Sequence, residues 1–269
     1  MTEPWLTVKR GAAPLLVSFP HTGLDIPSDC TAGLVSAELA RHDADWHIDK
    51  LYGFAADLGA TIVHTALSRT VIDVNRDPSG ISLYPGQPTT GLVPMETFDG
   101  RPLYGVGEAP GTEEIERRKR RYFAPFHAAL ADELKWLRAE HPGVVLYDCH
   151  SIRSEIPRLF PGELPVFNIG TNDGKSCAPV LTEQVAVICR STRWSHVVNG
   201  RFKGGWITRT YGRPADGIHV LQMELAYRGY LADETVPPRW DPDFAQPIQR
   251  TLRAVLDACL AFARGHGGT

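Results

Sequence analysis

Residues 144–151 read VVLYDCHS, so four apolar residues lead directly into an aspartate, a cysteine, a histidine and a serine. The apolar run follows the break at Pro142-Gly143, and it is typical of a buried strand that delivers polar side chains at its end. Before the break, apolar side chains recur at helical spacing over residues 113–140, with a kink expected at Pro125. A helix followed by a buried strand favours a parallel sheet covered by helices.

The same pattern continues in both directions along the chain. Short apolar or alternating runs predict strands at 15–19, 61–65, 70–74, 144–147, 165–169 and 218–225. Amphipathic segments predict helices at 41–58, 113–140, 177–190 and 248–262. This alternation predicts an α/β fold with a largely parallel sheet covered on both faces. Without a fixed repeat or a change of composition at a linker, we expect a single domain over residues 1–269.

Residues 78–111 are rich in proline and glycine and show no clear hydrophobic period. A segment of this length inside a compact domain is usually a functional loop or a lid. We therefore predict a loop excursion here, and its movement on substrate binding stays an open question.

Composition and charge exclude several classes of protein. Hydrophobic residues make up 43% of the 269 residues and charged residues 22%, as in ordinary soluble proteins. The net charge of −3 argues against non-specific nucleic-acid binding, although RRKRR at 117–121 is a local basic run. The five scattered cysteines lack a CxxC pair, and we find neither a signal-peptide pattern nor an apolar stretch of spanning length. We expect a cytoplasmic protein without a membrane anchor.

Polar residues follow three of the predicted strands. His21 follows the first, His150 follows residues 144–147, and Glu224 ends a later one. In sheets of this kind, ligands bind beyond the carboxyl ends of the strands. Two histidines and a carboxylate there suit a catalytic zinc site, because three protein ligands leave one coordination position open for water. The alternative is that each histidine has only a structural role.

Further candidate ligands lie in RHDADWHID at 41–49. On a helix, His42, Asp45 and Asp49 share one face, while Asp43 and His47 share another. Either face could point at a metal. The alternative is a solvated face with local ion pairs. Asp148 or a loop carbonyl could orient His150 from outside the metal site.

Arginines beside turns are candidate carboxylate sites. Arg69 and the pair Asn75-Arg76 follow predicted strands, and Arg209 lies near a flexible glycine pair. A guanidinium group can donate to both oxygens of a carboxylate at once. Because surface arginines are common, each one alone is weak support for a binding role.

Other chemistries receive less support. GTNDGKS at 170–176 resembles a phosphate-binding loop but has three residues between its glycines where the motif needs four. GxSxG and HExxH are both missing, which argues against a nucleophile-elbow hydrolase and excludes the usual helical zinc protease. Strand alternation predicts that Cys149 points away from Asp148 and His150 into the core.

Six motifs together resemble the N-formylglutamate amidohydrolases (N-formylglutamate deformylases). They are SFPHTGLDIP at 18–27, RHDADWHIDKLY at 41–52, SRTVIDVNRDPSG at 68–80, DCHSI at 148–152, NGRFKGGWITRTYG at 199–212 and VLQMEL at 220–225. The resemblance runs from about Leu16 to Leu231. The family is similar in fold to zinc carboxypeptidases and aspartoacylases, which implies a three-layer α/β/α domain with a mixed, mainly parallel sheet.

The resemblance implies a set of metal ligands. His21 and His150 match the two metal histidines of the family. The carboxypeptidase-like pattern has a glutamate three residues after the first histidine, but Leu24 stands there. Asp45 is therefore our first choice for the third ligand, and Asp25 is the alternative. Zn²⁺ is the expected metal, with another divalent transition metal possible in its place.

The resemblance also implies roles for residues that face the substrate. Glu224 matches the general base, and Arg69 is similar to an arginine near the scissile carbonyl. Asn75 and Arg76 look like a pair that binds a substrate carboxylate. Thr208 and Arg209 belong to a motif that carboxypeptidases lack, which suggests that they bind a second carboxylate.

The implied reaction is hydrolysis of N-formyl-L-glutamate to formate and L-glutamate, the last step of a histidine degradation route. In this hypothesis Glu224 accepts a proton from water, while Arg69 and the metal stabilise the developing oxyanion. One alternative is a zinc amidohydrolase for another N-acyl amino acid or a short peptide, and a second is a non-enzymatic binding module. The expected partner is a small-molecule substrate rather than nucleic acid or membrane, and the oligomeric state is left open.

Overall fold

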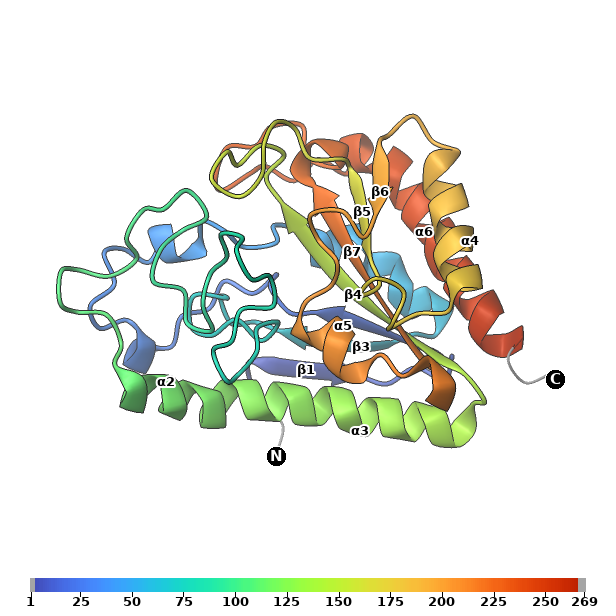
Figure 1. The fold of residues 1–269 in the computed structure, drawn as a ribbon, viewed down its shortest axis with the longest axis horizontal. Helices are drawn as coiled ribbons and strands as arrows, with labels where there is room; N and C mark the ends of the chain where they lie inside the picture. The colour runs from blue at the N-terminus through green and yellow to red at the C-terminus, as the bar shows by residue number, and fades with distance from the viewer. Residues whose placement is uncertain (1–2, 266–269) are drawn as a thin grey trace.

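The computed structural model describes residues 3–265. A seven-stranded sheet lies at its centre, with strand order β1-β3-β2-β4-β7-β5-β6 (Figure 1). The strands are β1 (Leu6–Lys9), β2 (Leu15–Phe19), β3 (Thr61–Thr65), β4 (Val144–Ile152), β5 (Phe167–Gly170), β6 (His196–Val198) and β7 (Ile218–Ala226). Only the pairs β1–β3 and β5–β7 are antiparallel among these strands. The sheet is therefore mixed and mainly parallel, as predicted.

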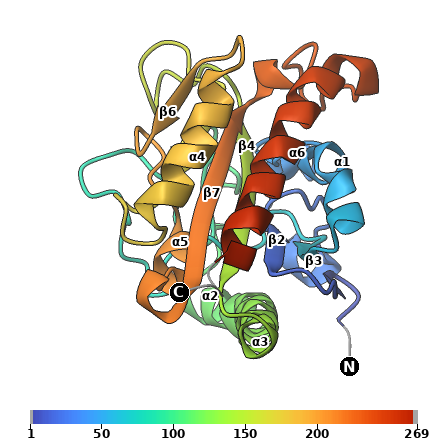
Figure 2. The ribbon, with the colours of Figure 1, turned by 90° about the vertical axis from the view of Figure 1, so that its right-hand side faces the viewer.

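Helices cover both faces of the sheet. On one side, α2 (Thr112–Arg118), the π-helical segment η4 (Lys119–Phe123) and α3 (Ala124–Glu140) form one long rod (Figure 1). On the other side, α4 (Pro179–Arg190) and α6 (Pro242–Gly265) run next to each other (Figure 2). The short helices are η1 (Ser28–Cys30), η2 (Leu39–Arg41), α1 (Ile48–Leu51), η3 (Gly53–Leu58), α5 (Trp206–Tyr211), η5 (Pro214–Asp216) and η6 (Tyr227–Gly229).

Alternate side chains along the central strands belong to two different apolar cores, one on each face of the sheet. Leu16, Leu146 and Val220 pack in the core that contains residues of α3. Their strand neighbours pack in the other core, with residues of α4 and α6. Because successive side chains of a strand point to opposite faces, both faces need an apolar cover. The three-layer α/β/α architecture is confirmed.

The central strands β4 and β7 pair in register over their whole length, from Val144 opposite Ile218 to Ile152 opposite Ala226. Beyond the apolar half of β4, Asp148 and His150 continue the alternation of Leu146 and point to the same face. Cys149 points to the opposite face, where it is fully buried in the core with α4 and α6. Its predicted orientation is thus confirmed.

The predicted continuous helix over 41–58 is wrong. His47 has a φ angle of 59°, in the left-handed region that a right-handed helix cannot include. The backbone amide of Asp45 donates to the carbonyl oxygen of His21, 3.0 Å away, and not to a helical partner. These two features divide the segment into η2, α1 and η3, so His42, Asp45 and Asp49 do not share one helical face.

The predicted strand over 70–74 is also wrong. Val71, Ile72 and Val74 are buried in the core beside α3, which explains the apolar pattern. However, β3 already pairs with β1 on one edge and with β2 on the other, so no sheet edge is left there for another strand. The backbone amide of Asp73 instead donates to the carbonyl oxygen of Leu92, within residues 78–111, at 2.7 Å.

Other predicted elements differ mainly at their ends. The helix over 113–140 contains the π-helical segment η4 directly before Pro125, where the kink was expected. Residues 78–111 form neither a helix nor a strand, as predicted for an excursion. The sequence patterns gave no indication of β1, β6 or α5, which have four, three and six residues. Across residues 3–265, every helix is too short or too polar to cross a membrane.

Candidate active site

A cavity of about 50 Å³ lies at the carboxyl ends of β2, β4 and β7. His21, His150 and Glu224 line it from these three strand ends. The excursion over 78–111 contributes further wall residues, namely Tyr84, Pro88, Thr89, Thr90 and Phe98. The cavity is thus lined both by the predicted strand-end residues and by residues of the predicted loop.

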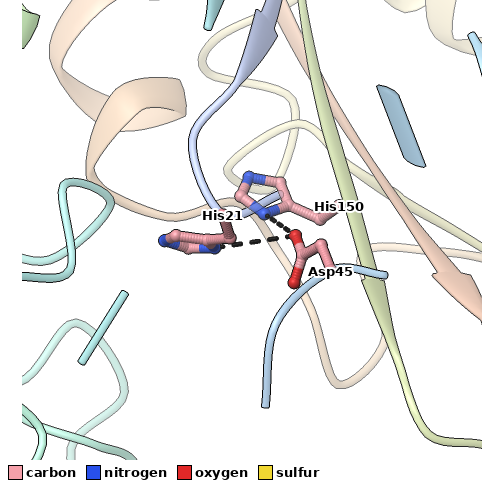
Figure 3. A group of neighbouring side chains, drawn as sticks. All are labelled: His21, Asp45 and His150. Atoms are coloured by element: carbon pink, nitrogen blue, oxygen red, sulfur yellow. Dashed lines mark hydrogen bonds and ion pairs between the residues drawn. The ribbon is translucent and has the colours of Figure 1, made fainter. Parts of the chain in front are cut away.

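His21, Asp45 and His150 come together as one buried cluster (Figure 3). Their candidate ligand atoms all lie within 4.8 Å of one another. Asp45 Oδ2 is 3.1 Å from His150 Nδ1 and 3.6 Å from His21 Nδ1. His21 directly follows β2, Asp45 lies between η2 and α1, and His150 lies near the carboxyl end of the central strand β4, so residues far apart in sequence meet here.

Two atoms of this cluster are buried without a hydrogen-bond partner among the described residues. They are His21 Nδ1 and Asp45 Oδ1. Leaving a polar atom buried and unpaired is unfavourable, typically by about 1–3 kcal/mol. Nitrogen and carboxylate donors in this arrangement suit a divalent transition metal. The residues present therefore fit a metal ion.

Both histidines are oriented from outside by carboxylates. His21 Nε2 lies 2.7 Å from Asp73 Oδ1, and His150 Nε2 lies 2.8 Å from Asp148 Oδ2. A carboxylate that accepts the outer ring proton leaves the inner Nδ1 free to bind a metal. Asp148 was one of the two expected outer partners of His150, the other being a loop carbonyl. Asp73 was not predicted, and the only signal was its position as an acidic residue inside the apolar run VIDV at 71–74.

Glu224 is a buried carboxylate next to the cluster. It stands opposite His150 in the β4–β7 register, and Gln222 Nε2 donates to its Oε2 at 3.1 Å. Burial raises the pKa of Glu224 to about 7. His150 lowers this pKa, whereas the negative charge of Asp45 raises it. A carboxyl group with a pKa near neutrality can both accept and return a proton.

Arg69 is held in a fixed position at the cavity wall. Its Nη2 donates to Asp73 Oδ2 at 2.6 Å, and its Nη1 lies 3.6 Å from Asp45 Oδ1. The guanidinium carbon lies 4.9 Å from the ring centroid of Phe98. Charge pairing and stacking together fix the direction in which the remaining donors point.

Asn75 and Arg76 also line the cavity. Asn75 Nδ2 lies 3.0 Å from His150 Nε2, while its Oδ1 accepts from the backbone amide of Ile207 at 2.8 Å. Arg76 Nη2 donates to Thr90 Oγ1 at 3.1 Å. Asn75 therefore connects the surroundings of His150 to the start of α5.

Three predicted site residues belong neither to the cavity lining nor to the cluster of His21, Asp45 and His150. Asp25 is exposed and bridges to Leu67 in another part of the surface. Thr208 is fully buried on α5. Arg209 donates from Nε to the carbonyl oxygen of Gly204 at 3.2 Å, and its guanidinium lies 5.2 Å from the ring centroid of Tyr84. The structure does not bring these three residues to the cluster.

The lining also includes residues that the sequence patterns did not single out. Arg201 lies in the same motif as Thr208 and Arg209, and Gln222 donates to Glu224. Gly205 fits there because a Cβ atom would approach Asn75 Nδ2 to 2.4 Å. The available signals were Arg201 in NGRFKGG at 199–205 and the polar Gln222 inside the apolar run VLQMEL at 220–225.

A mainly parallel α/β sheet with buried histidines and carboxylates at its carboxyl edge is typical of α/β enzymes that bind their ligands at that edge. Comparison with known proteins identifies the group more closely. The model of the N-formylglutamate amidohydrolase family matches residues 13–231, and the chain belongs to this family. The resemblance inferred from the six motifs is confirmed.

Individual relatives match almost the whole chain. The chain is 48% identical over 258 residues to an N-formylglutamate deformylase of Pseudomonas putida, with 96% of each protein covered. It is 45% identical over 260 residues to an N-formylglutamate deformylase of Pseudomonas aeruginosa, covering 96% of this chain and 97% of that protein.

Solved structures share the fold. The crystal structure of N-formylglutamate amidohydrolase from Ralstonia eutropha JMP134 matches with a TM-score of 0.78 and 29% identity, covering 96% of this chain and 98% of that one. A gene product of Agrobacterium tumefaciens matches with a TM-score of 0.71 and 18% identity, covering 96% of this chain and 95% of that one. The second match supports the fold alone.

Proposed function

We propose that this protein is a metal-dependent amidohydrolase that cleaves N-formyl-L-glutamate into formate and L-glutamate. The observation that carries the proposal is the buried cluster of His21, Asp45 and His150, whose two histidines line one cavity with Glu224. The names of the two Pseudomonas relatives support the choice of substrate. We place the reaction at the last step of a histidine degradation route, in the cytoplasm.

His21 Nδ1, His150 Nδ1 and an oxygen of Asp45 are the atoms that would hold the metal. Zn²⁺ suits two imidazole nitrogens and one carboxylate, with a coordination position left open, and other divalent transition metals accept the same ligands. When bound, such an ion lowers the pKa of water from about 15.7 toward about 7 and polarises a carbonyl group. Asp73 and Asp148 keep the two histidines in the tautomer that this role requires.

Glu224 is the proton carrier of the proposed mechanism. It accepts a proton from the attacking water, whose oxygen forms a bond to the formyl carbon. It then donates this proton to the nitrogen atom as the carbon–nitrogen bond breaks, so formate and the free amine leave. A pKa of about 7 suits both steps at neutral pH.

Arg69 stabilises the negative charge that develops on the formyl oxygen. Its guanidinium is already ordered by Asp73 and Phe98, so little reorganisation is needed during the reaction. A donor placed in this way typically contributes about 2.7–4 kcal/mol of transition-state stabilisation.

The glutamate part of the substrate supplies most of the binding energy, because a formyl group is small. We propose that Arg76, positioned beside Asn75, binds the α-carboxylate from the cavity wall. Direct binding of a carboxylate by Thr208 and Arg209 stays a prediction. In support of an indirect role, both contact the segment at Gly204 that borders the cavity.

A kinetic panel tests the choice of acyl group. The substrates are the N-formyl, N-acetyl and N-formimidoyl derivatives of L-glutamate, each measured by release of glutamate. The proposal predicts the largest kcat/KM for the N-formyl derivative. A larger kcat/KM for either of the others would move the function to another N-acyl amino acid. Tight metal binding without hydrolysis of any substrate would favour the binding-module alternative.

A further inference from the structure

We propose that Arg201 binds the side-chain carboxylate of the substrate and thereby selects a dicarboxylic amino acid. The inference rests on the proposed function and assigns a residue that determines specificity. Arg201 lies on the segment between β6 and α5 and lines the same cavity as His150 and Glu224.

The guanidinium group of Arg201 is anchored by neutral groups. Its Nε donates to the carbonyl oxygen of Leu159 at 3.0 Å, and its Nη2 donates to the carbonyl oxygen of Pro88 at 2.8 Å. Its carbon lies 5.5 Å from the ring centroid of Tyr84 and 5.3 Å from that of Phe202. Two carbonyl bonds and two aromatic contacts fix the group while leaving donors for a ligand.

The positive charge of Arg201 has no ion-pair partner among residues 3–265. The two other arginines of the lining both contact Asp73, Arg69 through Nη2 at 2.6 Å and Arg76 through Nε at 3.4 Å. Arg201 is thus the lining arginine that has no carboxylate within ion-pair distance among the described residues. A half-buried cation of this kind is a suitable site for a ligand carboxylate.

A second positive charge makes the cavity suited to a dianion. Burial lowers the pKa of Arg201, and the positive charge of Arg76 acts in the same direction, whereas Tyr84 and Glu224 act against it. A ligand with two carboxylates relieves this repulsion when each arginine binds one of them. N-formyl-L-glutamate carries two carboxylates, whereas the corresponding glutamine derivative carries one.

Arg209 differs from Arg201 although both contact Tyr84. The guanidinium carbon of Arg209 lies 5.2 Å from that ring centroid, but Arg209 is not part of the cavity lining. Tyr84 itself donates to the carbonyl oxygen of Gly204 at 2.8 Å. Arg209 therefore supports the wall from behind, while Arg201 faces the cavity.

The test compares N-formyl-L-glutamate with N-formyl-L-glutamine, a neutral analogue of nearly equal size. We expect Arg201→Gln to lower kcat/KM for the glutamate derivative by about 10- to 150-fold, mainly through KM, as a hydrogen bond to a charged group predicts. The ratio of kcat/KM between the two substrates should fall toward one. Arg193→Gln is the matched control, because Arg193 is exposed and its guanidinium lies 5.0 Å from the Trp194 ring centroid, outside the cavity.

A measurement on the unaltered protein avoids any dependence on folding of the variant. Phenylglyoxal modifies accessible arginines, and peptide mass spectrometry reports the rate at Arg201. We expect L-glutamate to slow this modification much more than L-glutamine at equal concentration. Equal rates with both amino acids, or an unchanged substrate ratio in Arg201→Gln, would overturn the assignment. Absence of formate release by the unaltered protein would instead refute the proposed function.

Discussion

His150 and Glu224 occupy opposite positions in the register of the parallel strands β4 and β7. Neighbouring strands lie about 4.8 Å apart, and paired residues point to the same face. The proposed metal ligand and the proposed base are therefore spaced by the sheet itself and not by a loop. A site built on strands holds its geometry more rigidly than one built on loops.

This relationship predicts the behaviour of Glu224→Gln. The substitution keeps the size of the side chain and removes its ability to accept a proton. Because Glu224 lies outside the cluster of His21, Asp45 and His150, metal binding should persist while kcat falls by about 10²- to 10⁴-fold. Formate release and metal content per chain are the two measurements. Glu183→Gln is the control, since Glu183 is exposed on α4, and turnover near the control level in Glu224→Gln would exclude Glu224 as the base.

The third ligand can be decided with two matched variants. Asp45→Asn should weaken metal binding by more than 100-fold, because it removes a proposed ligand at the centre of the cluster; loss of an outer partner typically costs about 10- to 100-fold. Asp25→Asn should leave metal affinity unchanged, since Asp25 is exposed and bridges to Leu67 elsewhere. Titration against a chromophoric chelator measures both. The reverse order of effects would make Asp25 the ligand.

Asp73 is expected to act through the residues that it orients. Its carboxylate contacts both His21 Nε2 and Arg69 Nη2. Asp73→Asn should lower metal affinity by about 10- to 100-fold, the usual effect of losing an outer carboxylate. The same chelator titration reads this out, with Asp77→Asn as a control that lies near in sequence but outside the cavity lining. An affinity equal to that of the control would show that Asp73 does not orient His21.

The burial of His127 predicts that the protein loses stability in mild acid. Its ring contacts the carbonyl oxygen of Val74 at 2.8 Å and the hydroxyl of Tyr211 at 2.9 Å, and burial lowers the pKa of His127 to about 4. The unfolded chain, with a histidine pKa near 6.5, binds a proton there that the folded chain does not. Its contribution to stability is therefore present above about pH 6.5 and decreases as the pH falls toward 4.

Between pH 7 and pH 5 we expect His127 to reduce the free energy of unfolding by about 1–2 kcal/mol. His127→Gln should be less stable at pH 7 but should lose less on acidification. Urea unfolding at both pH values, compared with the unaltered chain, gives the difference. The same pH dependence in both chains would contradict this role for His127.

The fold was predictable where burial dominates. The apolar runs at 15–19 and 218–225 coincide with β2 and β7, because these strands are buried on both faces. The run at 61–65 coincides with β3, whose residues alternate between buried and half-buried. Short peripheral elements such as β1 and β6 carry little apolar pattern, since their residues are largely exposed or half-buried. The segment over 70–74 has the pattern of a strand but does not form one, because both edges of β3 are already paired, with β1 and β2.

Site residues at the ends of strands could be predicted from the sequence, whereas residues brought together only by the fold could not. His21, His150 and Glu224 were chosen from the rule that ligands gather at strand ends, and the structure places all three on one cavity, while their roles stay predictions. Asp45 was chosen through the family resemblance, and its position comes from a backbone bond to His21 that no helical spacing predicts. Asp73 lies 52 residues from His21, so only the fold brings them together.

Formate release from N-formyl-L-glutamate, before and after chelation, tests the central claim most directly. Purified protein should release formate, lose this activity when its metal is removed, and regain it when Zn²⁺ is added. Metal analysis of the chelated sample confirms that removal is complete. Undiminished formate release from protein shown to be free of metal would contradict the proposed mechanism.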